Sequence, residues 1–156
     1  MTLFANSIDV GFSPNQGSLQ LVLKTINSAQ KSLCMATYSF TSRPVVEALI
    51  AAKNRGVNIK IVSDAKANSD KYTATRYLVN HGFNVRLNDH YAIMHNKFIV
   101  VDNQTVETGS FNYSAAAVDK NAENVIVIWN NPAIASKYAA ECMRLFNQAS
   151  PMIQQY

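Results

Sequence analysis

The sequence predicts an α/β fold in which a mixed, mainly parallel β-sheet is flanked by helices on both faces. In the first half of the chain, short apolar runs rich in β-branched residues alternate with amphipathic segments, which is typical of parallel strands joined by helices. Later, the runs KFIVVD and TVETGS are separated by only two residues, which predicts an antiparallel hairpin. A sheet that contains both kinds of pairing is mixed.

Glycines and prolines place the ends of the individual elements. The helix expected at 44–55 has Ser42 at its N-cap, Pro44 in its first turn and Gly56 directly after its end, and Gly82 stops the next helix. All 156 residues are expected to form a single domain. Strands are expected at residues 3–10, 33–40, 57–63, 83–87 and 124–129, and helices at 17–30, 44–55, 71–81 and 132–148.

The composition is that of an ordered domain outside the membrane. Apolar residues make up 48% of the chain, but no apolar stretch approaches the ~20 residues that cross a bilayer. The first residues do not read as a signal peptide, so we expect that an exported form has lost its leader. We expect Cys34 and Cys142 to be buried free thiols. No His or Cys spacing typical of zinc is present, so no metal or other cofactor is expected.

The net charge of +4 is concentrated in the middle of the chain. Between residues 53 and 86 the balance is +5, and the rest of the chain carries −1. Some of these cations will lie on solvated helix faces, but the local excess indicates a surface for a polyanion. The loop at 64–71 should lie at the carboxyl end of a strand, where such sheets have their cleft. We therefore expect Lys66, Asn68 and Lys71 to contact nucleic acid.

The hairpin gathers a set of chemically useful side chains. If the two-residue turn pairs Asp102 with Thr105, then Lys97 pairs with Ser110 across the hairpin. Two positions further along the strands, His95 pairs with Asn112. The same count places Asp102 on the other face, where we expect it to bond its own loop rather than to act in catalysis.

These residue types fit attack on a phosphodiester without a metal. His95 can act as a nucleophile, and Lys97 and Asn112 can bind the non-bridging phosphate oxygens. Glu123 begins a strong strand and is the candidate carboxylate that orients the imidazole from behind. Ser110 can contact the phosphate or the histidine, or it can be a plain turn residue.

This pattern resembles the signature of the phospholipase D superfamily. The matching residues are His95-x-Lys97, Asp102 and Gly109-Ser110-x-Asn112. The resemblance extends through residues 38–40, 106–112, 123–124 and 127–130 and covers nearly the whole chain, which is most similar to the small, single-motif bacterial endonucleases of the Nuc type. It implies a phospholipase D-like fold and largely sequence-independent hydrolysis of DNA or RNA. It also implies a periplasmic or secreted location, with the cytoplasm as the alternative.

In-line displacement at phosphorus also needs a general acid opposite the nucleophile. Members with two motifs unite them across a pseudo-twofold axis, so the resemblance implies that a single-motif chain forms a homodimer. His95 of one subunit would attack and His95 of the other would act as the acid, then as the base for water. His90 is the alternative acid within a monomer.

Two other functions compete with the nuclease. The superfamily also contains lipid-cleaving enzymes, but the chain is short, has a basic middle segment and shows no membrane-seeking helix, so no membrane partner is expected. The second is a DNA-binding module with a dead site, which the complete set of His95, Lys97, Asn112 and Glu123 disfavours.

Overall fold

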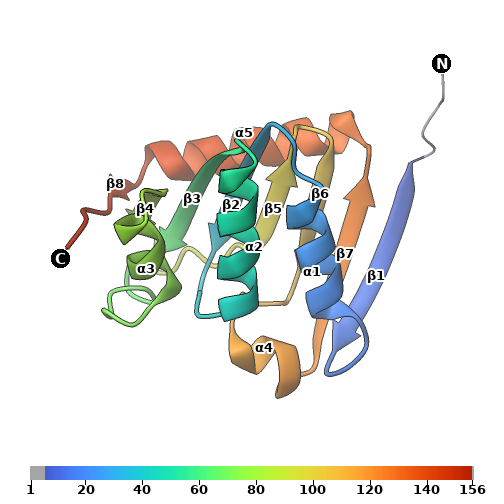
Figure 1. Cartoon of the computed structure of the whole chain (residues 1–156), viewed down its shortest axis with the longest axis horizontal. Coiled ribbons are helices and arrows are strands. Elements are labelled where there is room, and N and C mark those ends of the chain that lie inside the picture. Colours follow the sequence, from blue (N-terminus) through green and yellow to red (C-terminus); the bar gives the residue numbers. More distant parts are fainter. Residues whose placement is uncertain (1–5, 156) are drawn as a thin grey trace.

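The protein is described by a computed structural model that places residues 6–155. A single eight-stranded sheet runs through this part of the chain in the order β1-β7-β6-β5-β2-β3-β4-β8 (Figure 1). The predicted strand at 3–10 lies partly outside the described residues, and its described part belongs to β1. The strands are β1 (Ser7–Ser13), β2 (Ser32–Thr37), β3 (Asn58–Asp64), β4 (Asn84–Asn88), β5 (Phe98–Val101), β6 (Thr105–Gly109), β7 (Glu123–Trp129) and β8 (Ser150–Pro151).

The sheet is mixed as predicted, but most of its pairings are antiparallel. Parallel pairing is confined to β2 with β3 and β3 with β4, and the other five neighbouring pairs are antiparallel. The expectation of a mainly parallel sheet is therefore wrong. Although β1 is followed by a helix, it pairs with β7 at the far edge instead of with β2, and the hairpin strands fill the space between.

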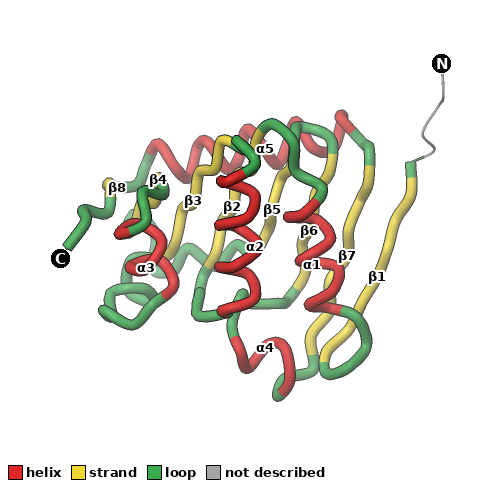
Figure 2. Tube along the Cα trace, viewed as in Figure 1, coloured by secondary structure: helices red, strands yellow, loops and turns green. Residues whose placement is uncertain are grey.

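Helices cover both faces of the sheet, as the sequence predicted (Figures 1 and 2). The helices α1 (Ser18–Asn27), α2 (Arg43–Asn54) and α3 (Ala74–Asn80) lie on one face, over the larger apolar core. The long helix α5 (Pro132–Asn147) lies on the other face, against β2, β3, β5 and β6, over a second core. A short helix, α4 (Ala115–Asp119), and β8 were not predicted.

The predicted helix ends agree with the structure at the glycines but not at every start. Gly56 and Gly82 follow α2 and α3 with φ of 91° and 80°, values that a glycine adopts without strain. Helix α3 begins at Ala74 instead of Lys71. The backbone N–H of Tyr72 donates to Asp70 Oδ1 at 2.9 Å, so this stretch forms a side-chain-stabilised turn before the helix.

The hairpin of β5 and β6 has a register that differs by one residue from the predicted one. Val101 pairs with Thr105, so three residues form the connection instead of two. Asp102 and Asn103 both have positive φ, 54° and 53°, and Gln104 N donates to Val101 O at 2.9 Å. A one-residue shift changes which side chains share a face. The predicted pairs of Lys97 with Ser110 and of His95 with Asn112 are therefore wrong. All four residues also lie beyond the ends of the paired strands.

Asp102 lies in the turn of the hairpin, at the end opposite to His95 and Lys97, and fixes this turn to another loop. Its carboxylate accepts hydrogen bonds from the backbone N–H groups of Gln30, Lys31 and Ser32 at 3.0, 2.7 and 2.9 Å. We expected Asp102 to form hydrogen bonds within its own loop, and this expectation is wrong because its partners lie in another loop. The carboxylate joins the turn of the hairpin to the loop between α1 and β2, which is distant in sequence.

Cys34 and Cys142 form a disulfide that links β2 to α5. The expectation of two free thiols is wrong. The two cysteines are 108 residues apart in sequence, and only the packing of α5 across β2 brings them together.

We expect Asp102→Asn to lower the free energy of unfolding by about 1–3 kcal/mol, because an amide turns two N–H donors toward a cluster of backbone donors. Urea unfolding measures this change. Asp119→Asn on the exposed surface of α4 is the matched control and should be neutral. Equal stability of the two variants would show that the three hydrogen bonds contribute nothing net.

Candidate active site

The candidate site lies at the edge of the sheet where β2 and β3 end, the lower edge in Figure 1. Because β5 runs antiparallel to β2, the start of β5 lies beside the end of β2. Lys97 directly precedes β5, His95 lies two residues before Lys97, and Tyr38 directly follows β2. The end of β6 and the start of β7 reach the same edge, which brings Ser110 and Glu123 there.

His95 and Lys97 form a compact pair against an aromatic ring. The Nζ of Lys97 lies 3.3 Å from both ring nitrogens of His95 and donates to the His95 carbonyl oxygen at 2.9 Å. The Tyr38 ring meets the imidazole edge-on, with 4.7 Å between ring centres, and lies 5.6 Å from the Lys97 Nζ. His95 is exposed, so this pair is open to a ligand from solvent.

Glu123 belongs to a second cluster of polar groups at the same edge. Its carboxylate accepts hydrogen bonds from Ser110 Oγ and, at 3.2 Å, from Asn121 Nδ2. Ser110 Oγ also accepts from the backbone and side-chain amides of Asn124, at 3.0 and 3.3 Å. We expected Glu123 to bond the imidazole, but no such bond occurs among the described residues. Since β7 pairs with β6, the first carboxylate of β7 meets the residue that follows β6.

Lys97 connects the two clusters electrostatically. Burial lowers the pKa of the Lys97 ammonium from its ordinary value, and the negative charge of Glu123 opposes this shift. The carboxylate thus favours the charged form of the lysine that lies beside His95.

Asn112 lies on the segment that joins β6 to α4. Its side-chain oxygen is buried and has no hydrogen-bond partner among the described residues. Buried amide groups normally have partners, so this side chain retains hydrogen-bonding capacity for a ligand. The segment starts at Gly109, where a Cβ would come within 2.2 Å of Asn124 O, so only glycine permits the close approach to β7.

A buried carboxyl anchors the residue after Asn112. Tyr113 and Glu107 are 0% and 1% exposed, and the tyrosine hydroxyl donates to Glu107 Oε2 at 2.6 Å. Burial raises the pKa of Glu107 to about 8, although the hydrogen bond from Tyr113 acts in the opposite direction. The Tyr113 carbonyl accepts the backbone N–H groups of Thr41 and Ser42, both at 2.9 Å. These bonds fix Asn112 relative to the segment that follows Tyr38.

The loop predicted to bind nucleic acid divides into exposed and buried residues. Lys66 and Lys71 are exposed and available. Asn68 is fully buried, and its Nδ2 donates to the carbonyl oxygens of Tyr38 and Asp64 while its Oδ1 accepts from Phe40 N. The expectation that Asn68 contacts substrate is therefore wrong, because its amide is used in positioning the Tyr38 segment.

The other two histidines each contact a tyrosine ring. His90 is exposed, and its ring meets that of Tyr91 at 5.0 Å. His81 follows α3, and its ring stacks on Tyr77 at 4.0 Å. Within the part of the chain that the structure describes, there is no group of three or more His, Cys, Asp or Glu side chains suited to a metal ion.

Comparison with known proteins places this geometry in a family. The family model described as "Cardiolipin synthase, PLD-like domain" matches residues 22–147. The chain belongs to the phospholipase D-like family. The crystal structure of the phospholipase D family member Nuc from Salmonella typhimurium is similar, with 42% identity, a TM-score of 0.93, and coverage of 96% of this chain and 99% of that one.

Curated members of the phospholipase D-like family are longer. A phospholipase D from Rickettsia bellii is 36% identical over 126 residues, which cover 81% of this chain and 63% of the relative. A mitochondrial cardiolipin hydrolase from Danio rerio is 30% identical over 137 residues, which cover 87% of this chain and 60% of the relative. The chain thus spans less than two thirds of the length of these relatives.

Several residues at this edge of the sheet received no role in the sequence-based prediction. Tyr38 entered only through the resemblance, and Asn121 was not singled out, although each touches a candidate residue. Glu107 could have been noticed as a carboxylate at an inward-facing position of an apolar strand. Nothing in the sequence marks Asn121, since its contact depends on how the segment before β7 folds back.

We expect the free energy of unfolding to fall as the pH rises, because of the raised pKa of Glu107. Between pH 4.5 and about 8 the unfolded chain releases this proton while the folded chain keeps it. Between pH 5 and 7.5 this group should lower the free energy of unfolding by about 3 kcal/mol. Glu107→Gln keeps an acceptor for the tyrosine hydroxyl but does not titrate, so the fall between these pH values should be smaller. Urea unfolding of both proteins measures the difference, and parallel pH profiles would contradict this account.

Proposed function

We propose that the chain is a metal-independent endonuclease that hydrolyses phosphodiester bonds of DNA or RNA with little sequence preference, through a phosphohistidine intermediate. The observation that carries the proposal is the exposed His95 beside the Lys97 ammonium. Asn112, on the segment after β6, has a side-chain oxygen without a partner among the described residues, and its Nδ2 can donate to a phosphate oxygen. This set supplies a nucleophile and fixed donors for phosphate oxygens, as a bound magnesium does in other nucleases.

The reaction proceeds in two displacements. A ring nitrogen of His95 attacks phosphorus, the N–P bond forms, and the P–O bond to the leaving oxygen breaks while a general acid protonates that oxygen. Water then attacks phosphorus, its proton passes to the conjugate base of that acid, and the N–P bond returns its electron pair to the ring. Lys97 and Asn112 stabilise the charge on the non-bridging oxygens in both steps.

Glu123 and Ser110 support this chemistry through Lys97. Partial burial disfavours the charged form of Lys97, which would contact the phosphate, and the Glu123 carboxylate opposes this effect. Ser110 and Asn121 fix that carboxylate by hydrogen bonds. In this proposal, Glu123 favours the charged form of Lys97 through its negative charge, in place of the direct contact with the imidazole that the sequence predicted.

A homodimer supplies the general acid. An apolar stripe on β1 is exposed at Ile8, Val10 and Phe12, by 60%, 57% and 47%. The stripe ends at Phe12, which pairs with Asn124 next to Glu123. A second copy that buries this stripe would reach the edge that carries the site at the Phe12 end of β1, and the proposed twofold axis would lie there and bring one His95 toward the other. His90 remains the alternative acid.

The disulfide supports a location outside the cytoplasm. Disulfides persist in oxidising compartments and are rare in the cytosol of mesophiles. Among residues 6–155, no helix has the length and apolar character to cross a bilayer. A periplasmic or secreted location is consistent with the disulfide. Such a location would also keep a non-specific nuclease away from the genome.

Cleavage of lipid head groups is the second candidate function. It is favoured by the names of the curated relatives and by Ile93, which is 48% exposed two residues before His95. The exposed Lys66 and Lys71 and the excess of basic residues between 53 and 86 favour nucleic acid instead.

We expect the wild-type protein to cut plasmid DNA in the presence of EDTA, and His95→Ala to lose at least about a thousandfold in rate because the nucleophile is gone. Agarose gels follow the cutting, and phospholipid vesicles are assayed in parallel for released head group. Head-group release without DNA cleavage would assign the lipid function, and a mobility shift alone would indicate a binding module. Cleavage that EDTA abolishes and magnesium restores would contradict metal independence.

We also expect inactive His95→Ala chains to reduce the activity of wild-type partners. Co-refolding equal amounts gives about half heterodimers, so activity should fall to about a quarter of that of the same total amount of wild type. Val10→Asp places a charge in the apolar stripe and should give a monomeric mass in solution with little activity. Activity at about half, linear in the wild-type fraction, together with a monomeric wild-type mass, would make His90 the better candidate for the acid.

A further inference from the structure

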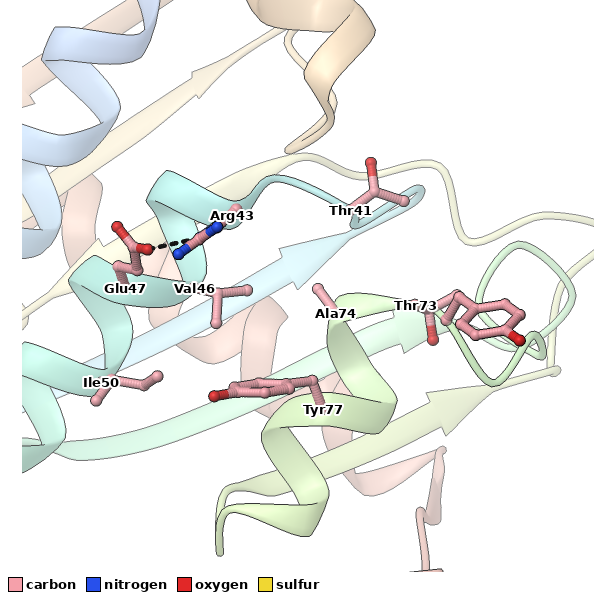
Figure 3. A pocket seen from close by; sticks show the side chains of 9 residues that line it. Thr41, Arg43, Val46, Glu47, Ile50, Thr73, Ala74 and Tyr77 are labelled. Carbon is pink, nitrogen blue, oxygen red and sulfur yellow. Dashed lines mark hydrogen bonds and ion pairs between the residues drawn. The ribbon is translucent and has the colours of Figure 1, made fainter.

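A groove of about 400 Å³ lies between α2 and α3, on the helical face next to the candidate site (Figure 3). Its floor is aliphatic, formed by Val46 and Ile50 of α2 and Ala74 of α3. The ring of Tyr77 lies across it from α3, and Thr41 and Tyr72 also line it. We call this feature the α2–α3 groove.

The aromatic rings of the α2–α3 groove are unusually accessible. Tyr72 is 81% exposed and Tyr77 is 48% exposed. The Lys71 Nζ lies 4.9 Å from the centre of the Tyr72 ring. Exposed aromatic rings alternating with cations are typical of surfaces on which the bases of single-stranded nucleic acids stack while cations follow the phosphates.

The opposite wall of the groove carries polar groups of both kinds. Arg43 Nε donates to Glu47 Oε1 at 2.8 Å, and the side chains are 88% and 61% exposed (Figure 3). The guanidinium offers donors and the carboxylate offers acceptors. The edge of a nucleobase also presents both donors and acceptors, whereas a phosphate presents acceptors alone. This wall therefore suits a base better than a phosphate.

One short segment joins the groove to the candidate site. Tyr38, at its start, contacts both His95 and Lys97, and Thr41, at its end, lines the groove. The segment is held from both sides, since Asn68 bonds Tyr38 O and Phe40 N, and Ala74 N donates to Phe40 O at 3.1 Å. A chain bound with one phosphate at His95 would reach the groove within a few nucleotides.

We propose that the α2–α3 groove binds an unpaired base of a single-stranded nucleic acid whose nearby phosphate lies at His95. This inference rests on the proposed nuclease function and adds a substrate class to it. In a duplex, the faces of each base are covered by its neighbours and its pairing edge is occupied, so only an unpaired base can enter between the tyrosines and the Arg43–Glu47 pair. The groove therefore favours single strands over duplex as substrate.

The test compares three substrates: a single-stranded DNA oligonucleotide, the same sequence as a duplex, and bis(p-nitrophenyl) phosphate, a diester without bases. Tyr72→Ala and Tyr77→Ala should each raise KM for the single strand about tenfold. KM for the duplex and for the small diester should not change. Tyr72→Phe and Tyr77→Phe keep the rings and should behave like wild type, and the small diester shows that each variant is folded.

The outcomes separate this inference from the proposed function. If wild type cleaves both DNA substrates but neither alanine variant alters KM for the single strand, the groove has no role in substrate binding, and the nuclease function stands. An equal rise in KM for the duplex would overturn the assignment to unpaired bases. If wild type hydrolyses the small diester but no DNA, the nuclease function fails, and this inference fails with it.

Discussion

The antiparallel pairing of β5 with β2 is the interaction on which the rest of the site depends. It brings the start of β5, with His95 and Lys97, to the carboxyl ends of β2 and β3, where the Tyr38 segment and the loop with Lys66 and Lys71 emerge. A parallel β5 would have placed His95 at the opposite edge of the sheet. The disulfide and the Asp102 carboxylate both restrain strands of this pair, through α5 and through the turn.

Buried polar bonds fix the irregular segments that leave this edge. The Asn68 amide and the Glu107 carboxyl are both buried, and each holds a loop that carries a site residue. A neutral Glu107 is compatible with an apolar core, whereas the ionised form would lose its hydration without a cation nearby. Such bonds cost little when every group is paired, and they allow one arrangement of the loops instead of several.

The site balances exposure against charge. His95 is exposed, whereas Lys97 beside it is partly buried, which lowers its pKa, and the charge of Glu123 opposes this shift. An edge of a sheet offers this combination, because strands end there with side chains toward solvent while neighbouring strands still supply fixed partners. The proposed second subunit would approach on one side, at the apolar stripe of β1, and the proposed flanking nucleotide on the other, at the α2–α3 groove.

The sequence by itself determined the local elements and the family. Glycines after helices, β-branched runs and the spacing of His95, Lys97, Ser110 and Asn112 are local features, so most helices and strands and the family could be predicted, and candidate residues for the site could be named. The tertiary structure decided what depends on partners far along the chain. It placed β1 beside β7, paired Cys34 with Cys142 and buried Asn68. It also set the hairpin register. The three-residue turn has positive φ at Asp102 and Asn103, and the Asp102 carboxylate is held there by a loop some 70 residues away in sequence. Pairing and burial are properties of the packed chain, and no local pattern encodes them uniquely.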